Sequence, residues 1–356
     1  MGSKFQIAQS SLTIPYSAGL ASAPAVLGTA FGWITGLLLD IELAKTDAGG
    51  PTTYQDWLYR SMTGISVMGG GKPYLTVSGP DLRALYWATR LRLRGRAKAP
   101  DMQAGAVTFR HQLPLLFGVN PLRVDDHTNF FDSTAAIAPD TDLRVQVTWA
   151  ANTSIGANRT VGAGTLLRVT PVSFFPATSA DEPKYYPQWV SSPFTPPQNI
   201  AGLAGNWPLA PGFFYRRSTV MILSGASPND VRTDGIAANA VSEIGLRTAD
   251  GRTPVNMKTW DFTQSSQYQF QVADDNSAVP GAALAAGASS IGIPYNAGVG
   301  VFDWVQLADT SDPSNADPVY GVNMTQKLSG AAAIALSVDN NANLNLVALH
   351  EAYNPW

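Results

Sequence analysis

Short apolar segments that alternate with polar residues recur along most of the 356-residue chain, and Gly, Pro, Asn or Asp residues separate them. Alternation with a period of two is the pattern of a half-buried β-strand, and turn residues between such runs are typical of all-β proteins. Clear examples are DLRVQVTWA at 142–150, TLLRVTPVSFF at 165–175 and LNLVALHEAY at 344–353. The sequence therefore predicts an all-β fold, with nearly the whole chain in strands and loops.

One segment has the pattern of a helix instead. In SGPDLRALYWA, at 78–88, Ser78 can cap the first turn, and Pro80 stands where the fixed φ of proline suits the start of a helix. We therefore expect a helix to begin here.

Landmarks in the first half of the chain recur in the second half at an almost constant spacing. The matched landmarks, each about 180 residues apart, are Gly32 with Gly212, GGGKP at 69–73 with DGRTP at 250–254, Pro114 with Pro294, and Pro176 with Pro355. A spacing that is kept in order through both halves indicates a tandem duplication. Each copy has room for about eight short strands, which is the size of a jelly roll, a double sheet of two Greek keys.

The duplication predicts four parts: an N-terminal arm at 1–27, a first jelly roll at 28–176, a connection at 177–211 and a second jelly roll at 212–356. The connection is rich in proline and aromatic residues. Because proline cannot donate to a β-ladder, we expect no central strand in the connection. Its many aromatic residues predict an ordered, extended segment that packs along both barrels.

Charge is scarce in this chain, with 14% charged residues and a net charge of −3. Ordinary soluble domains carry about 25% charged residues, so we expect neighbouring subunits to cover much of the surface. The negative net charge provides no basic field and argues against sequence-specific binding of nucleic acid. The absence of cysteine excludes disulfides, thiol catalysis and thiolate zinc sites.

The segment LHEAYNPW at 349–356 contains a His-Glu pair, which is the first half of the zinc-protease signature HExxH. That signature needs a second His four residues after His350, where Asn354 stands. In the duplication the pair falls in the last strand of the second copy. Adjacent strand residues point to opposite faces, so His350 and Glu351 are not expected to bind one ion. If they are partly exposed, replacing either should cost at most about 1 kcal/mol.

Other catalytic patterns are incomplete. GGGK at 69–72 lacks the first glycine of a P-loop, because Ser66 stands there, and Pro73 replaces the residue that would hold magnesium. No G-x-S-x-G nucleophile elbow occurs, and no two of the three histidines have the spacing of a metal cupin. We therefore predict no enzyme, no metal and no cofactor. A double-barrel carbohydrate-binding or hydrolytic protein, lectin-like or similar to the glycan amidases, remains the alternative.

One charge pattern stands apart. In TRLRLRGRAK, at 89–98, arginine occupies every second position from 90 to 96: Arg90, Arg92, Arg94 and Arg96. On a strand, these four side chains would line one face while the leucines between them face the core. Such a row is either a solvated strand face that discourages edge pairing, or a contact strand for acidic neighbours, lipid headgroups or packaged genome.

Two fused jelly rolls with these landmarks resemble the double jelly-roll major capsid proteins of tailless icosahedral DNA viruses, the lineage of the tectivirus-like phages and the adenovirus hexon. The resemblance covers nearly everything after residue 28. It rests on GISVMGGGKPYLTVSGPDL, FRHQLPLLFGVNPL and DLRVQVTW in the first half, and on VSEIGLRTADGRTPVNMKTWDF and IGIPYNAGVGVFDW in the second.

The resemblance implies a homotrimer, in which pairs of similar barrels from three chains fill a hexagonal site by closed three-fold symmetry. It also implies a virion component, assembled in the cytoplasm of the host cell, with a bacteriophage as the type of virus. The implied partners are copies of the chain, neighbouring capsomers, and penton or minor capsid proteins. The N-terminal arm would face the inner side of the shell and contact neighbours or an internal membrane.

Overall fold

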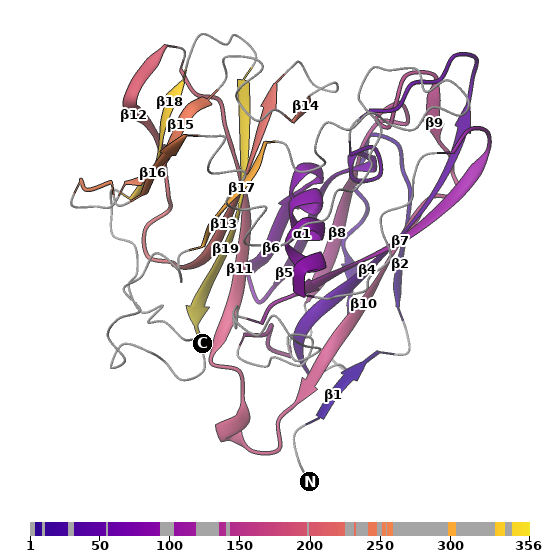
Figure 1. The fold of residues 1–356 in the computed structure, drawn as a ribbon. Helices are drawn as coiled ribbons and strands as arrows, with labels where there is room; N and C mark the ends of the chain where they lie inside the picture. The colour runs from indigo at the N-terminus through magenta and orange to yellow at the C-terminus, as the bar shows by residue number, and fades with distance from the viewer. Residues whose placement is uncertain are drawn as a thin grey trace. The chain divides into compact units, whose positions relative to one another are not determined.

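The computed structural model describes residues 4–8, 11–27, 32–54, 56–92, 103–118, 135–139, 143–197, 199–224, 231–232, 241–247, 251–253, 255–258, 298–303, 332–338 and 344–356. The chain divides into two compact units (Figure 1). The first unit consists of Met1–Trp189, Asn276–Gly292 and Asn354–Trp356, and the second consists of Val190–Asp275 and Ile293–Tyr353.

The first unit is made of strands that form two antiparallel sheets. Its strands are β1 (Lys4–Ile7), β2 (Leu12–Pro15), β3 (Ala25–Val26), β4 (Trp33–Asp47), β5 (Met62–Gly69), β6 (Lys72–Ser78), β7 (Val107–Leu116), β8 (Arg144–Trp149), β9 (Arg159–Val161) and β10 (Leu166–Phe175). One sheet has the order β1-β10-β4-β7, with β2 paired to β10 and β9 paired to β4. The other contains the order β11-β6-β5-β8-β3, in which β11 (Tyr185–Phe194) begins in this unit. The all-β prediction is confirmed.

Alternate residues of these strands form the core of the first unit. In β4, Leu39, Ile41 and Leu43 are fully buried, while Asp40 and Glu42 between them are only partly covered. The same alternation buries Phe109 and Leu113 of β7, Val145 and Val147 of β8, and Leu167 and Val169 of β10. The period of two in the sequence is therefore the period at which side chains enter the core.

Helix α1 (Gly79–Arg92) begins where the sequence predicted. The backbone N–H and the hydroxyl of Ser78 both donate to Asp81 Oδ2 at 2.8 Å, and the Asp81 N–H donates to Ser78 Oγ at 3.4 Å. N–H groups in the first turn have no partner within a helix, so this reciprocal cap fixes the start of α1. The helix contacts β7 of one sheet and β5 and β6 of the other.

Replacing Ser78 with Ala is expected to destabilise the first unit by about 1 kcal/mol, because an N-cap hydroxyl satisfies an otherwise unpaired N–H. Denaturant unfolding measures the change. The control is Thr178→Ala, since Thr178 and Asp181 form the same reciprocal cap on the short exposed helix η3 (Ser179–Asp181). A smaller loss is expected for the control. An equal loss of stability in both variants would show that the cap at Ser78 contributes no more than the exposed cap at Thr178.

The stretch at 177–211 contains two strands, β11 (Tyr185–Phe194) and β12 (Ile200–Pro208). Strand β11 begins in the first unit and ends in the second, and β12 pairs with a strand of the second unit. Pro187 and Pro193 lie within β11. The expectation of no central strand in this stretch is therefore wrong, because β11 is paired on both sides, with β19 and with β6. A proline removes one donor from one side of a strand, and the flanking residues can still pair.

The second unit also contains two antiparallel sheets among its described residues. Besides β12, its strands are β13 (Phe214–Ser224), β14 (Val231–Arg232), β15 (Val241–Arg247), β16 (Val255–Lys258), β17 (Val299–Asp303), β18 (Ala333–Val338) and β19 (Leu344–Pro355). Strand β13 pairs with β19, and also with β14 and β17. The other sheet has the order β12-β18-β15-β16.

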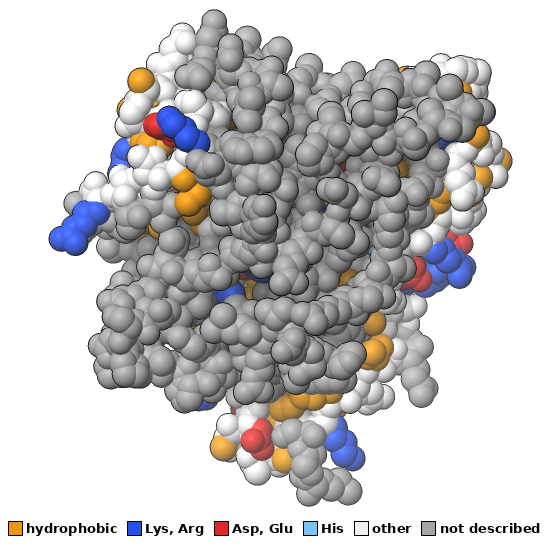
Figure 2. Space-filling model, in the orientation of Figure 1, with side chains coloured by type: hydrophobic (Ala, Val, Ile, Leu, Met, Phe, Trp, Pro, Cys, Tyr) orange, Lys and Arg blue, Asp and Glu red, His pale blue; other side chains and the backbone are white. Residues whose placement is uncertain are grey.

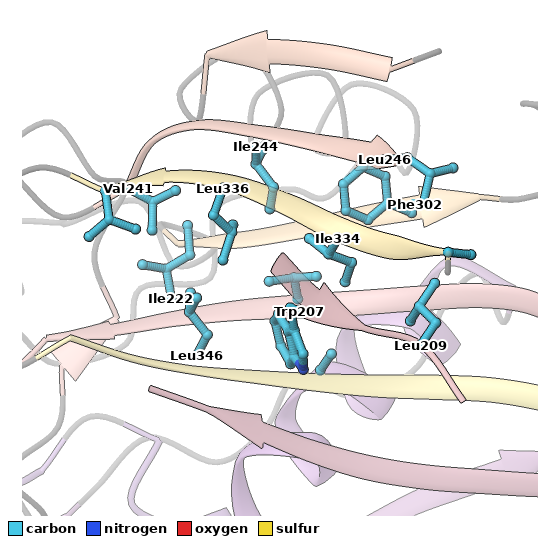
Figure 3. Packing of buried hydrophobic residues seen from close by; sticks show 14 of the residues in the cluster. Trp207, Leu209, Ile222, Val241, Ile244, Leu246, Phe302, Ile334, Leu336 and Leu346 are labelled. Carbon is cyan, nitrogen blue, oxygen red and sulfur yellow. The ribbon is translucent and has the colours of Figure 1, made fainter. Parts of the chain in front are cut away.

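An apolar cluster of described residues forms the core of the second unit (Figure 3). Ile222 of β13 and Leu346 of β19 face Ile334 and Leu336 of β18 across this core, and Trp207 of β12 lies among them. The cluster also contains Leu209, Val220, Val241, Ile244, Leu246, Phe302, Val338, Leu344 and Ala348. Because these side chains come from both sheets, burying them holds the two sheets together.

A β-bulge interrupts a long strand pair in each unit. In the first unit Gly36 pairs with Val172 and Ile34 with Ser173, so that Thr35 is the extra residue of a β-bulge. In the second unit the register shifts between Tyr215 and Arg217, which pair with Ala352 and Glu351, so that Arg216 is the extra residue. These positions obey the spacing of about 180 residues to within one residue. Pro294, the other landmark of that comparison, lies outside the described residues.

The described surface carries few charged side chains. On the face shown in Figure 2 most described side chains are apolar or uncharged, with a few basic and acidic groups between them. No helix in the described part of the chain combines the length and the apolar character needed to cross a bilayer.

Candidate functional site

The His-Glu pair singled out in the sequence lies in β19, which pairs with β13. His350 is opposite Ser218, and Glu351 is opposite Arg217. The prediction that the pair lies in a strand is confirmed. As neighbours on a strand, the two side chains point to opposite faces of the sheet.

His350 faces the apolar core of the second unit and is 6% exposed. Its Nδ1 lies 2.9 Å from the hydroxyl oxygen of Ser218. The rings of Tyr215 and Trp207 meet the imidazole edge-on, with centroids 5.6 and 6.3 Å away. Burial lowers the pKa of His350 to about 4, because the charged form would lose its hydration. The imidazole is therefore neutral near pH 7.

Glu351 forms a buried, two-pronged ion pair with Arg217. Arg217 Nη2 donates to Glu351 Oε1 at 2.7 Å, and Arg217 Nε donates to Oε2 of the same carboxylate. The side chains are 4% and 2% exposed, respectively. Both carboxylate oxygens are thus engaged by one guanidinium, which is the strong, bidentate geometry for such a pair.

The small cost expected for replacing His350 or Glu351 was conditional on partial exposure, and that condition is not met, because both residues are buried. Strand β19 is covered on both faces: Ala348 and Ala352 are buried on the side of His350, and Leu349 is buried on the side of Glu351. A polar residue within a strand of this kind must find a buried partner. The sequence contains one sign of this arrangement that the sequence analysis did not use: Arg216 and Arg217 stand side by side in the otherwise apolar strand β13.

The pair does not form a metal centre. His350 and Glu351 are committed to different partners on different faces of β19. Among the residues that the structure describes, no group of three or more His, Asp or Glu side chains lies close enough to hold an ion.

The first unit has its own buried charges, at the end of β4. Lys45 Nζ donates to Asp47 Oδ2 and to the carbonyl of Gly105, each at 2.7 Å, and the Gly105 N–H donates to Asp47 Oδ2 at 2.9 Å. Arg159 of β9 approaches the other carboxylate oxygen of Asp47 at 3.7 Å, and burial lowers the pKa of its guanidinium. These contacts tie the segment before β7 to the end of β4, which is a structural role.

A second set of charges lies on the outer face of the sheet that contains β4. Arg168 and Arg110 each approach Glu42 at 2.9 Å, and Arg168 also approaches Asp40 at 3.4 Å. The hydrogen bond from Arg168 lowers the pKa of Glu42. Positive and negative charges balance here, so this face presents no field of one sign.

The described part of the arginine row does not have the predicted conformation. Arg90 and Arg92 belong to helix α1, and Arg94 and Arg96 lie outside the described residues. Residues two apart on a helix are separated by about 200° around the axis, so Arg90 and Arg92 do not share a face. The contact strand proposed from the alternation is therefore wrong for this part of the row. Arginine and leucine both favour helices, and α1 simply continues through them.

GGGK at 69–72 is a hairpin turn between β5 and β6. Gly70 and Gly71 have φ values of 54° and 76°. Two consecutive residues at positive φ form the tight turn that joins adjacent antiparallel strands, and glycine adopts it without strain. The segment joins two strands, whereas a phosphate-binding loop leads from a strand into a helix.

Comparison with known proteins gives a clear answer for the fold. No protein-family model matches the chain, and no curated protein is significantly similar in sequence. The crystal structure of the major capsid protein of Sulfolobus turreted icosahedral virus matches with a TM-score of 0.66 at 12% identity. The match covers 99% of this chain and 97% of that one. The fold is that of the viral major capsid proteins.

Two further capsid structures match over almost the whole chain. The capsid of the virus PBCV-1 has a TM-score of 0.53 at 13% identity, covering 99% of this chain and 94% of that one. The major capsid protein of bacteriophage PM2 has a TM-score of 0.50 at 13% identity, covering 99% and 98%. The predicted double jelly roll is thus confirmed as the fold class.

Proposed function

We propose that the chain is a major capsid protein, which forms trimeric, pseudo-hexameric capsomers that tile an icosahedral shell. The observation that carries this proposal is the full-length structural likeness to a viral major capsid protein, which leaves almost nothing unmatched in either chain. A likeness confined to one jelly roll would fit many functions, since that fold serves capsids, lectins and cupins alike. A tandem pair matched end to end is far more restrictive, and the matched proteins are structural rather than catalytic or carbohydrate-binding.

The duplication is part of this proposal, with a first jelly roll at 28–176 and a second at 212–356. The paired bulges at Thr35 and Arg216, at equivalent places in equivalent strand pairs, support it. Two similar barrels in one chain allow three chains to approximate a hexagon by closed three-fold symmetry. The low content of charged residues supports extensive contacts between subunits, because charged residues are depleted from the cores of such interfaces.

Light scattering after size-exclusion chromatography tests the proposal. The expected molar mass is three times that of one chain, and electron microscopy of concentrated samples should show hexagonal particles or shells. A monomer at micromolar concentration would contradict the capsid proposal, because obligate interfaces of several thousand Å² do not dissociate there. A monomer would favour the carbohydrate-binding or hydrolytic alternative.

We further propose that the N-terminal arm contacts an internal membrane. Strand β1 pairs with the end of β10, and exposed apolar side chains stand here: Ile7 is 47% and Phe175 is 37% exposed. Lys4, opposite Phe175, adds a positive charge. Apolar and aromatic side chains next to lysine suit the boundary between lipid headgroups and acyl chains. Penton or minor capsid proteins are further partners that follow from the capsid role.

Co-sedimentation with vesicles that contain anionic phospholipid tests the membrane contact. The double variant Ile7→Ser, Phe175→Ser should bind several-fold less than the unchanged protein. The matched control is Leu20→Ser, Val26→Ser, which removes two side chains of similar exposure, 60% and 56%, elsewhere in the first unit. Equal binding by both variants would refute the membrane contact. That result would not contradict the trimer, which is tested separately by light scattering.

The arginine row remains a proposed contact site for acidic neighbours, lipid or genome, and its first two members, Arg90 and Arg92, are helical. If the row serves contacts between subunits, lipid or genome, changing Arg90, Arg92, Arg94 and Arg96 to Gln should leave the fold intact, because a surface charge contributes little to stability. Assembly should weaken, and the salt dependence of assembly should become shallower, because exposed charges are screened over about 8–10 Å at physiological ionic strength. Light scattering during assembly at increasing salt measures both effects. Unchanged assembly with unchanged salt dependence would leave the row as a solvated surface.

A further inference from the structure

The side chain of Trp356 lies in a seat of aromatic residues on the first unit. Its ring centroid is 5.4 Å from that of Trp33, 4.9 Å from that of Tyr186 and 6.3 Å from that of Tyr74. Lys72 Nζ lies 5.3 Å from the Trp356 ring centroid and 4.6 Å from that of Tyr186. A lysine ammonium at such distances from aromatic rings is attracted by their electron-rich faces.

Polar contacts hold the backbone that carries this ring. The Trp356 N–H donates to the carbonyl of Lys184 at 3.2 Å. The Asn354 side-chain amide donates to Gln188 Oε1 at 2.9 Å. The segment 354–356 is therefore fixed at three points: an amide pair, a backbone hydrogen bond and an aromatic seat.

The seat draws on both sheets of the first unit. Trp33 begins β4, which belongs to one sheet, whereas Lys72 and Tyr74 lie on β6, which belongs to the other. Tyr186 lies on β11. The indole of Trp356 therefore contacts residues at the ends of both sheets. The segment 135–137 also links these sheets, because Ile137 pairs with Ile34 of β4 and Ala135 pairs with Tyr185 of β11.

The path of the chain makes this contact unusual. Residues 354–356 belong to the first unit, whereas the preceding residues of β19, up to Tyr353, belong to the second. We propose that Asn354–Trp356 is a strap, delivered by the last strand of the second unit, that closes one end of the sandwich in the first unit. The stability of the first unit then depends on a segment that only the folded second unit places correctly. This proposal holds independently of the capsid role.

Trp356→Ala should loosen the first unit at the seat. The Trp356 side chain is 43% exposed but contacts three aromatic rings, and these contacts are expected to change the local opening equilibrium by about tenfold. Hydrogen exchange of the full chain measures this, residue by residue. Amides of β6 and of β11 near Tyr186 should exchange about tenfold faster in the variant. Amides of β18 in the second unit should be unchanged.

Two further variants keep the test independent of overall folding. Lys72→Gln removes only the cation and should accelerate exchange at the same amides by a few-fold. Trp356→Phe keeps an aromatic ring, so its effect on exchange should lie between those of Lys72→Gln and Trp356→Ala. Leu20→Ala is the matched control, because it also truncates an exposed apolar side chain, here 60% exposed, away from the seat. The strap is refuted if Trp356→Ala leaves exchange in β6 and β11 unchanged, or if Leu20→Ala accelerates it equally.

Discussion

Replacing Glu351 with Gln is expected to destabilise the protein by roughly 3–5 kcal/mol, because it leaves Arg217 charged and buried without its counter-ion. Both side chains are almost fully covered, at 4% and 2% exposure. Two hydrogen bonds to one carboxylate currently offset the cost of removing the guanidinium from water. Denaturant unfolding of the wild type and the variant measures the difference.

The exposed ion pair between Lys258 and Glu243 provides the control. Lys258 is 65% exposed, so Lys258→Gln should cost less than about 1 kcal/mol. A second test separates the buried charge from the shape of the side chains. Replacing both partners, as Arg217→Met with Glu351→Leu, should recover much of the lost stability, since both charges of this pair are then removed together. If Glu351→Gln costs no more than Lys258→Gln, the pair is not buried in solution as described.

The cost expected here for replacing Glu351 is larger than the cost expected from the sequence for a partly exposed residue. The difference shows how much a local sequence pattern can reveal. The alternation of LNLVALHEAY placed His350 and Glu351 correctly on opposite faces of a strand. Whether both faces are covered depends on which strands and loops lie above and below, and those come from distant parts of the chain. The adjacent arginines at 216 and 217 were a sign of buried charge, and only strand pairing shows that Arg217 is opposite Glu351.

Two other differences between the sequence predictions and the structure have local causes. The alternation of arginine and leucine after Thr89 satisfies a strand pattern, but both residue types have high helix propensity, and helix α1 already precedes them. In 177–211 the prolines were given too much weight, since Pro187 and Pro193 are accommodated within β11. By contrast, the start of α1 was predictable because the cap at Ser78 involves residues only three apart.

The fold itself was predictable at the level of pattern. A jelly roll requires inward-facing apolar residues at alternate positions and turns between strands, and many side chains satisfy that requirement. Sequences can therefore diverge to 12% identity while the chain path is kept over 99% of the length.

Between about pH 6.5 and pH 4, His350 is expected to make the protein lose roughly 3 kcal/mol of stability. In the unfolded chain its pKa is the ordinary 6.5, and in the folded protein burial holds it at about 4. Below pH 6.5 the unfolded state gains a proton that the folded state does not accept. Stability is therefore complete above pH 6.5, falls as the pH drops towards 4, and levels off below that value.

The surroundings of His350 explain why the folded state rejects the proton. Tyr215 and Trp207 offer aromatic edges, Ser218 offers a hydroxyl, and the neighbouring carboxylate of Glu351 points to the other face of β19 and is held by Arg217. The hydroxyl of Tyr215 donates to the carbonyl of Ala210, and burial raises its pKa to about 12, so Tyr215 supplies no negative charge.

His350→Asn is the variant that isolates this effect, since an amide can keep a hydrogen bond to Ser218 without titrating. Unfolding free energies are measured for both proteins at intervals from pH 7.5 to pH 3.5. Carboxylates titrate in both, so the informative quantity is the difference between the two curves. The wild type should lose about 3 kcal/mol more than the variant across the window. Parallel curves would mean that His350 is accessible to protons in the folded protein, and that the core around Trp207 is open.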